Sequence, residues 1–225
     1  MANCYGSIQA CMLRWADVNE AGQPQPGASN GYQTDALIQV GVGVELEAGA
    51  DVSQKNGCGA LCQAFKQPDL IKRVTLEIPL CQLDAELIQL AVGGTVITSG
   101  GDAIGYELPT LSDTPKAGGV LEVWTYAWDG ESQALLTGSA AYFHFVFPHA
   151  RFTPGNFTLE APNFLQFPLV GYSDANPAVT INGPYNDWPA AVVAIGGITA
   201  SAGWFLDTTI PTAECGYQTV PGPAS

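Results

Sequence analysis

The chain has 225 residues, of which 21 are acidic and seven basic, so its formal net charge is -14 at pH 7. Apolar residues make up 47% of the sequence and charged residues only 12%, a composition that excludes a disordered chain and allows a sizeable core. The shortage of basic residues excludes a protein that holds nucleic acid on a positively charged surface. So few charged side chains also indicate an exterior that is partly buried against other subunits.

Two segments alternate between apolar and polar residues, the pattern of a half-buried strand. In residues 36–47 the apolar positions are Ile38, Val40, Val42, Val44 and Leu46, and the polar positions include Gln39, Glu45 and Glu47. In residues 73–80 the apolar positions are Val74, Leu76, Ile78 and Leu80, opposite Arg73, Thr75 and Glu77. We expect the apolar faces of both strands to turn toward the core.

Residues 48–71 separate these two strands and contain glycines and charges without a strand period. The sequence therefore predicts a long loop, which carries Cys58, Cys62, Phe65 and Lys66. Long loops inside a compact domain are uncommon and are often functional.

One helix is predicted, immediately after the second strand. Asp84 can cap its first turn, and Gly93 and Gly94 end it. Leu87, Ile88 and Leu90 recur at helical spacing and form an apolar side that should pack on the sheet. Cys81, between the strand and the helix, is expected to be buried and unreactive.

The segments 121–128 and 140–147 are apolar on both faces, so we expect both strands to be covered on both sides. Trp124 and Trp128 have two interpretations. They could form an exposed platform that binds carbohydrate, but a buried core or a subunit interface is the favoured role, because aromatic residues dominate the energetics of interfaces.

A search for catalytic motifs finds no nucleophile elbow and no phosphate-binding loop. His144 and His149, five positions apart on one strand, should point to opposite faces and cannot share a metal ion. We expect no enzymatic activity, no cofactor and no metal.

The six cysteines include a Cys58–Cys62 spacing that fits neither a redox pair nor a regular zinc knuckle. A metal or disulfide cluster of these two with Cys81 and Cys215 is conceivable, but small buried thiols are the favoured interpretation. No secretory leader is visible and no apolar run is long enough to cross a membrane, so we expect a protein that folds in a cytoplasm.

Taken in order, several segments resemble the major tail proteins of long-tailed actinobacterial phages. The resemblance starts at "LRWADVNEAGQPQPG" and continues through "IQVGVGVELEAGADVSQKNGCGALC" and "VTLEIPLCQLDAELIQLAVGG". It extends through "LEVWTYAW", "YFHFVFPHARFTPGNFTLEAPNFLQF" and "NGPYNDWP" to the Cys-bearing "AECG". The order and spacing of these segments carry the resemblance, which covers nearly the whole chain.

The resemblance implies a mostly β fold, a tail-tube-type sandwich of two packed antiparallel sheets with one flanking short α-helix. Residues 1–225 would form a single domain with an N-terminal arm (1–12), a long inter-strand loop (48–71) and an extended C-terminal tail (208–225). The loop, with Cys58, Cys62, Phe65 and Lys66, would contact neighbouring subunits.

The same resemblance implies a structural virion protein that assembles into stacked hexameric rings and forms the conduit for genome ejection. Its partners would be other copies of itself and further tail proteins such as the tape measure, the tail terminator and the baseplate or tip. It would be assembled in the host cytoplasm. Double-stranded DNA would pass without specific binding along a lumen lined by Gln39, Glu45, Glu47, Arg73, Thr75 and Glu77.

Two alternatives stay open at this point. The chain could be a tail terminator of related fold, or, in a different functional class, a monomeric β-sandwich that recognises carbohydrate through Trp124 and Trp128.

Overall fold

The structure, a computed structural model, describes residues 5–137, 141–159, 165–212 and 215–222. The helices are α1 (Ala85–Val92) and α2 (Ala190–Ala194). The strands are β1 (Tyr5–Asp17), β2 (Gly27–Thr34), β3 (Gly41–Glu47), β4 (Asp51–Lys55), β5 (Leu61–Lys66), β6 (Leu70–Leu80), β7 (Thr95–Ser99), β8 (Asp102–Glu107), β9 (Gly119–Asp129), β10 (Ala134–Leu135), β11 (Tyr142–Pro154), β12 (Phe167–Ser173), β13 (Gly203–Asp207) and β14 (Gly216–Val220).

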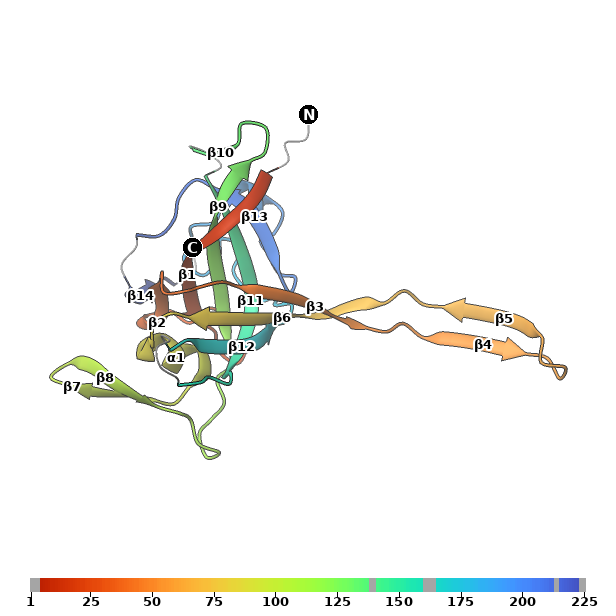
Figure 1. The fold of residues 1–225 in the computed structure, drawn as a ribbon, viewed down its shortest axis with the longest axis horizontal. Helices are drawn as coiled ribbons and strands as arrows, with labels where there is room; N and C mark the ends of the chain where they lie inside the picture. Colours follow the sequence, from red (N-terminus) through yellow and green to blue (C-terminus); the bar gives the residue numbers. More distant parts are fainter. Residues whose placement is uncertain (1–4, 138–140, 160–164, 213–214, 223–225) are drawn as a thin grey trace.

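Ten strands form one continuous antiparallel sheet in the order β14-β2-β1-β9-β11-β12-β6-β3, with β10 on β9 and β13 on β11. The sheet divides along β11. Residues Tyr142–Val146 of β11 pair with β13, and, beyond a bulge between Phe147 and Ala150, residues Ala150–Pro154 pair with β12. A bulge bends a strand and increases its twist, which lets β12, β6 and β3 cross over β1, β9 and β11 (Figure 1).

The main core lies between these two parts of the sheet. It is built from Leu13, Trp15, Tyr32, Leu37, Val74, Leu76, Ile78, Leu80, Leu87, Ile88, Leu90, Ala91, Leu121, Val123, Phe147, Ala150, Phe152, Phe167 and Leu169. A smaller cluster covers the other face of β9 and β11 and contains Val18, Val120, Val146, Val179, Trp188 and Val192. The prediction that both faces of β9 and β11 are covered is therefore confirmed.

The mostly β fold, with packed antiparallel layers and a flanking short helix, agrees with the predicted class. Both layers belong to one hydrogen-bonded sheet, so the sandwich arises by folding over a single sheet. The structure adds α2, a helix of five residues that the sequence pattern did not predict. The helices of the described residues, eight and five residues long, are too short to span a bilayer.

Helix α1 has the predicted ends and the predicted buried side. The Asp84 side chain accepts a hydrogen bond from the Leu87 backbone N–H, and Gly93, with a φ of 99°, ends the helix. Leu87, Ile88 and Leu90 are buried in the main core, where the helix packs against β1, β2 and β11. The helix thus closes the side of the core that the folded sheet leaves open.

Two hairpins project from the body toward opposite ends of its long axis (Figure 1). One is β4–β5, which continues the β3–β6 pair outward, and every residue of β4 and β5 is exposed. The other is β7–β8, which follows α1. The prediction of a loop over residues 48–71 is wrong, because this segment contains a paired hairpin. Its residues do not alternate between apolar and polar, because both faces of the hairpin are exposed to solvent.

Both terminal segments are docked on the sheet where the structure describes them. Residues 5–12, expected in a free N-terminal arm, belong to β1 and pair with β9. In the expected C-terminal tail, β14 pairs with β2. The remainder of the predicted arm, residues 1–4, lies outside the described residues.

The expectation that both predicted strands bury their apolar faces holds for β6 only. Val74, Leu76, Ile78 and Leu80 of β6 are buried, whereas Ile38, Val42, Val44 and Leu46 on or beside β3 are 45–58% exposed. Strand β3 begins at Gly41 and lies at the edge of the sheet, beyond the area that the core covers. Its apolar face is therefore left to solvent.

Replacing Leu87 with Asp should lower the free energy of unfolding by about 3–5 kcal/mol, because it places a carboxylate in the core without a partner. Leu83→Asp is the matched control, because Leu83 is 59% exposed and two residues before the helix. Urea unfolding monitored by circular dichroism measures both variants. Equal midpoints for the two variants would show that the helix does not depend on its packing against the sheet.

Candidate functional site

The predicted lumen residues form one polar face across β3 and β6. Gly41 pairs with Glu77, Gly43 with Thr75 and Glu45 with Arg73, and paired residues share a face of the sheet. The Arg73 guanidinium donates a hydrogen bond to Glu45, which lowers the pKa of that carboxyl. The ammonium of Lys72 lies 3.3 Å from the same carboxylate. This face is therefore a band of mixed charge, not a purely acidic one.

Two members of the predicted set lie at the ends of that face, outside its regular pairing. Gln39 is exposed in the segment before β3. Glu47 lies beyond a bulge at Glu45–Leu46 and pairs with Leu70. The structure thus brings Glu45, Arg73, Thr75 and Glu77 together and leaves Gln39 and Glu47 at the two ends of the strand.

The β4–β5 hairpin carries the residues predicted to contact neighbouring subunits. Val52 and Phe65 are paired and are 61% and 65% exposed, so they form an apolar spot on one face. Lys66 pairs with Asp51 at the base. Cys58 lies in the turn, where the Asn56 side chain accepts hydrogen bonds from the backbone N–H groups of Cys58 and Ala60.

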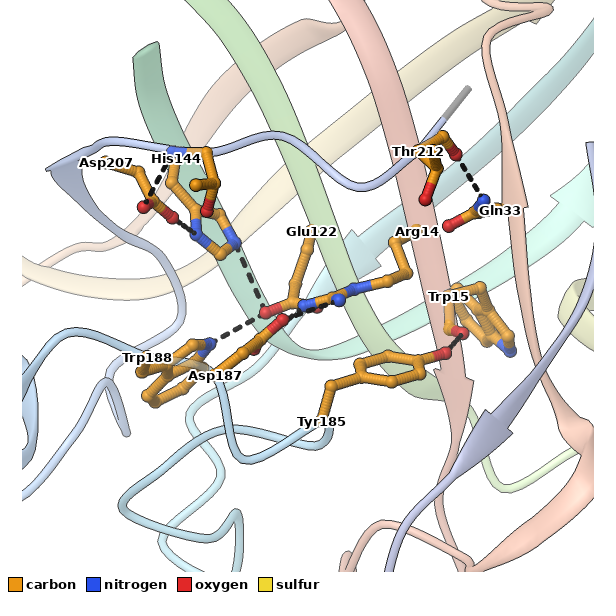
Figure 2. A network of polar contacts seen from close by, with 11 residues as sticks. Arg14, Trp15, Gln33, Glu122, His144, Tyr185, Asp187, Trp188, Asp207 and Thr212 are labelled. Atoms are coloured by element: carbon orange, nitrogen blue, oxygen red, sulfur yellow. Dashed lines mark hydrogen bonds and ion pairs between the residues drawn. The ribbon is translucent and has the colours of Figure 1, made fainter. Parts of the chain in front are cut away.

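A second candidate site, which the sequence did not predict, is a network of buried charges on the other face of β9 (Figure 2). Its centre is Glu122, which is fully buried. The Arg14 guanidinium donates from Nε to Glu122 Oε2 at 2.8 Å and from Nη1 to Asp187 Oδ2 at 2.7 Å. The Trp188 indole donates to Glu122 Oε1 at 2.7 Å.

His144 extends this network to β13. Its Nδ1 lies 3.1 Å from Asp207 Oδ2, and its Nε2 lies 3.2 Å from Glu122 Oε1 without the orientation of a hydrogen bond. The ring is stacked on Trp124 with centroids 4.0 Å apart and contacts Phe205. It is 1% exposed.

Opposing effects set the protonation states of these groups. Burial alone would lower the pKa of His144, but the carboxylates of Asp207 and Glu122 outweigh burial and the repulsion from Arg14, so its pKa is raised. Burial would raise the pKa of Glu122, but Arg14 and His144 outweigh it and lower that pKa. The network therefore favours a charged imidazolium between ionised carboxylates.

The sequence contains one signal for this network. Glu122 interrupts an otherwise apolar strand, and a carboxylate at such a position needs a buried partner. Its partners lie far away in the chain, at positions 14, 144 and 188. Without the fold, nothing in the local pattern identifies them.

The proposed carbohydrate platform is contradicted by the burial of Trp124. This side chain is 1% exposed and lies against His144, with the Arg14 guanidinium 4.9 Å from its ring centroid. Trp124 and Trp128 therefore do not form an exposed pair.

The cysteines differ from the expectation of buried thiols. Cys58, Cys62, Cys81 and Cys215 are exposed and unpaired, and Cys11 is half-buried. Cys81 follows the last buried residue of β6 and turns outward, so the prediction of a buried Cys81 is wrong. Within the described part of the chain, no three metal-ligating side chains gather into a group that could hold a metal ion.

Comparison with known proteins adds no family assignment: neither the family models nor the curated proteins searched match this chain.

The raised pKa of His144 predicts a pH-dependent stability. The pKa of an unfolded histidine is about 6.5, so this stabilisation is complete below about pH 6.5 and is lost as the pH rises through the higher folded pKa. The melting temperature should fall as the pH rises above about 6.5. In His144→Gln it should be lower and nearly independent of pH over that range.

His149→Gln is the matched control, since His149 lies on the same strand and bonds to a backbone carbonyl of Ala117. It should keep the parental pH dependence. An unchanged pH slope in His144→Gln would show that folding does not raise the pKa of His144.

Proposed function

We propose that this protein is a structural subunit that assembles with copies of itself, and that the assembly is the stacked-ring tube of a phage tail. The observation that carries the proposal is the pair of hairpins that project from opposite ends of the body (Figure 1). An isolated two-stranded hairpin is at best marginally stable in water. Among the described residues, no third strand pairs with the β4–β5 hairpin and no helix packs on it, so contacts with a partner would supply the missing burial.

The exposed apolar residues support the same proposal. Val42, Val44 and Leu46 on β3 continue toward the hairpin and its Val52 and Phe65, all at least 54% exposed. An exposed apolar edge strand favours pairing with another chain. Few charged residues are present to prevent that association.

A second copy of this chain is the favoured partner, because the two ends of the folded molecule carry different hairpins. A hairpin at one end and a different hairpin at the other favour head-to-tail contacts, which generate rings or helical stacks and not closed two-fold dimers. The resemblance to major tail proteins favours hexameric rings stacked into a tube. In that assembly the polar face of β3 and β6 would line the channel, and the chain's excess of acidic residues would keep DNA from binding during transit.

The monomeric carbohydrate-binding alternative is weakened by the burial of Trp124. A catalytic role for the buried network is likewise disfavoured, because Glu122 and His144 are 0% and 1% exposed. No specific observation favours either function.

Removal of the β4–β5 hairpin tests the proposal. The Gln67 backbone N–H bonds to the Ala50 carbonyl at 2.9 Å, so residues 51–66 can be replaced by a two-residue Asn-Gly turn that fits a paired site. The shortened protein should melt close to the parental temperature, because every removed residue is exposed or in the turn. It should form no tubes in negative-stain electron micrographs.

The control for this deletion is Gly57→Ser at the tip, where an added side chain meets open space, and this variant should still form tubes. Tubes of normal appearance from the deletion variant would contradict the role of the hairpin. A parental protein that remains monomeric under all conditions would contradict the proposed function itself.

The second test concerns the polar face. Replacing Glu47 and Glu77 together with lysine should leave tubes intact, because both side chains are exposed, but should make the tubes retain double-stranded DNA at low salt. Retention should decline as salt rises, since phosphate contacts depend on released counterions. A filter-retention assay with labelled duplex measures the effect.

A matched variant places the same two charges elsewhere, at the exposed residues Asp102, the first of β8, and Glu131, in the turn after β9. It should retain no more DNA than the parental tubes. Equal retention by both double variants would show that the β3–β6 face does not line the channel.

A further inference from the structure

A groove of about 660 Å³ lies beside the first turn of α1, between this helix and the β7–β8 hairpin. Several of its apolar side chains remain exposed: Leu83 at 59%, Ile104 at 65%, Leu108 at 49% and Phe157 at 45%. Asp84 and Glu86 also line it, and none of the residues that line it is basic. The groove is therefore an apolar surface with a negative rim.

The β4–β5 hairpin has the opposite character. Residues 51–66 contain two lysines, Lys55 and Lys66, and one acidic residue, Asp51, so this segment has a net charge of +1 in a chain whose net charge is -14. The hairpin also exposes Val52, Leu61 and Phe65 to between 61% and 65%. It combines apolar side chains with positive charge, the complement of the groove.

The hairpin of a given molecule cannot reach the groove of the same molecule. Figure 1 shows β4–β5 at one end of the long axis and β7–β8, with α1 at its base, toward the other end. The occupant of the groove must therefore come from elsewhere, and a second copy of this chain carries the matching segment.

The geometry points to a head-to-tail contact in which the β4–β5 hairpin of one copy docks in the groove between α1 and β7–β8 of the next. This inference rests on the proposed self-assembly and specifies the surface that receives the hairpin. Phe65, Val52 and Leu61 would bury against the exposed apolar lining, where aromatic anchors contribute most of the binding energy. Lys55 and Lys66 would lie near Asp84 and Glu86, which selects the orientation of docking.

The groove is suited to receive a partner because its walls are anchored to the body. The Tyr106 hydroxyl donates a hydrogen bond to the Gly93 carbonyl, which ties the base of the β7–β8 hairpin to the end of α1. The Asp84 carboxylate caps the helix. The groove residues would need little reordering when the hairpin docks, so less of the binding energy would be lost to ordering them.

Native cysteines report this contact directly. Cys58 and Cys62 are exposed on the hairpin, and Cys215 is exposed and lines the groove. Tubes assembled from equal amounts of isotopically light and heavy protein are treated with a short bismaleimide, and the linked peptides are mapped by mass spectrometry. Mixed light–heavy peptides that join Cys58 or Cys62 to Cys215 are expected in tubes and absent from dissociated protein.

Cys215→Ser should abolish these links, whereas Cys81→Ser should preserve them. Links from the hairpin cysteines only to each other in well-formed tubes would overturn the docking site and leave the proposed function standing. Absence of any assembly by the parental protein would overturn both.

A charge exchange provides a second measurement. Lys66→Glu and Glu86→Lys should each raise the concentration needed for assembly several-fold, and the two substitutions in one chain should restore it toward the parental value. The Lys66 side chain is exposed and the Glu86 side chain is partly exposed, so neither belongs to the core. Additive losses in the double variant would overturn the pairing of hairpin and groove.

Discussion

The buried ion pair between Arg14 and Glu122 is the constraint on which the body of this protein depends. Glu122 is at the centre of β9, the strand that joins β1 to β11, and a carboxylate there is costly unless its oxygens are fully engaged. Arg14 from β1, Trp188 from the segment after β12 and His144 from β11 meet this requirement. Removing one partner of such a pair typically costs about 3–5 kcal/mol, so the network fixes how these elements pack.

The network also explains why the second face of β9 is covered. Asp187 and Trp188 belong to an irregular segment that also contributes Val179 and Val192 to the smaller cluster. Their bonds to Arg14 and Glu122 hold that segment over Val120 and Val146. The body is thereby locked on both faces of its central strands, whereas in the described part of the chain nothing covers the β4–β5 hairpin or the apolar face of β3. A rigid body with exposed, apolar projections is the form expected of a subunit whose remaining burial takes place between molecules.

The local sequence pattern predicted those elements that are determined by residues adjacent in the chain. The period of β6 and the cap and apolar side of α1 were recognisable because adjacent residues determine them. The alternation of residues 36–47 identified two faces, but no local rule says whether an apolar face has a covering layer, and β3 lies beyond the core. Residues 51–66 showed no usable period because neither face is buried. Glu122 and His144 are brought together by contacts that also involve residues 14, 187 and 207, which lie far apart in the chain. The spacing of residues along the sequence does not reveal such long-range pairs.

Charge then determines how such molecules can approach one another. The net charge of -14 repels one copy from the next, and at physiological salt this repulsion is screened within about 8 Å. The hairpin differs, because it projects away from the acidic body and carries a small positive charge. It can therefore contact a neighbour while the two bodies remain farther apart. In the proposed assembly, docking of the hairpin would bring the exposed apolar stripe of β3 close to a second molecule, and burial of that stripe would offset the remaining repulsion. On this physical basis we expect the hairpin to make the first contact and the edge strand to complete the interface.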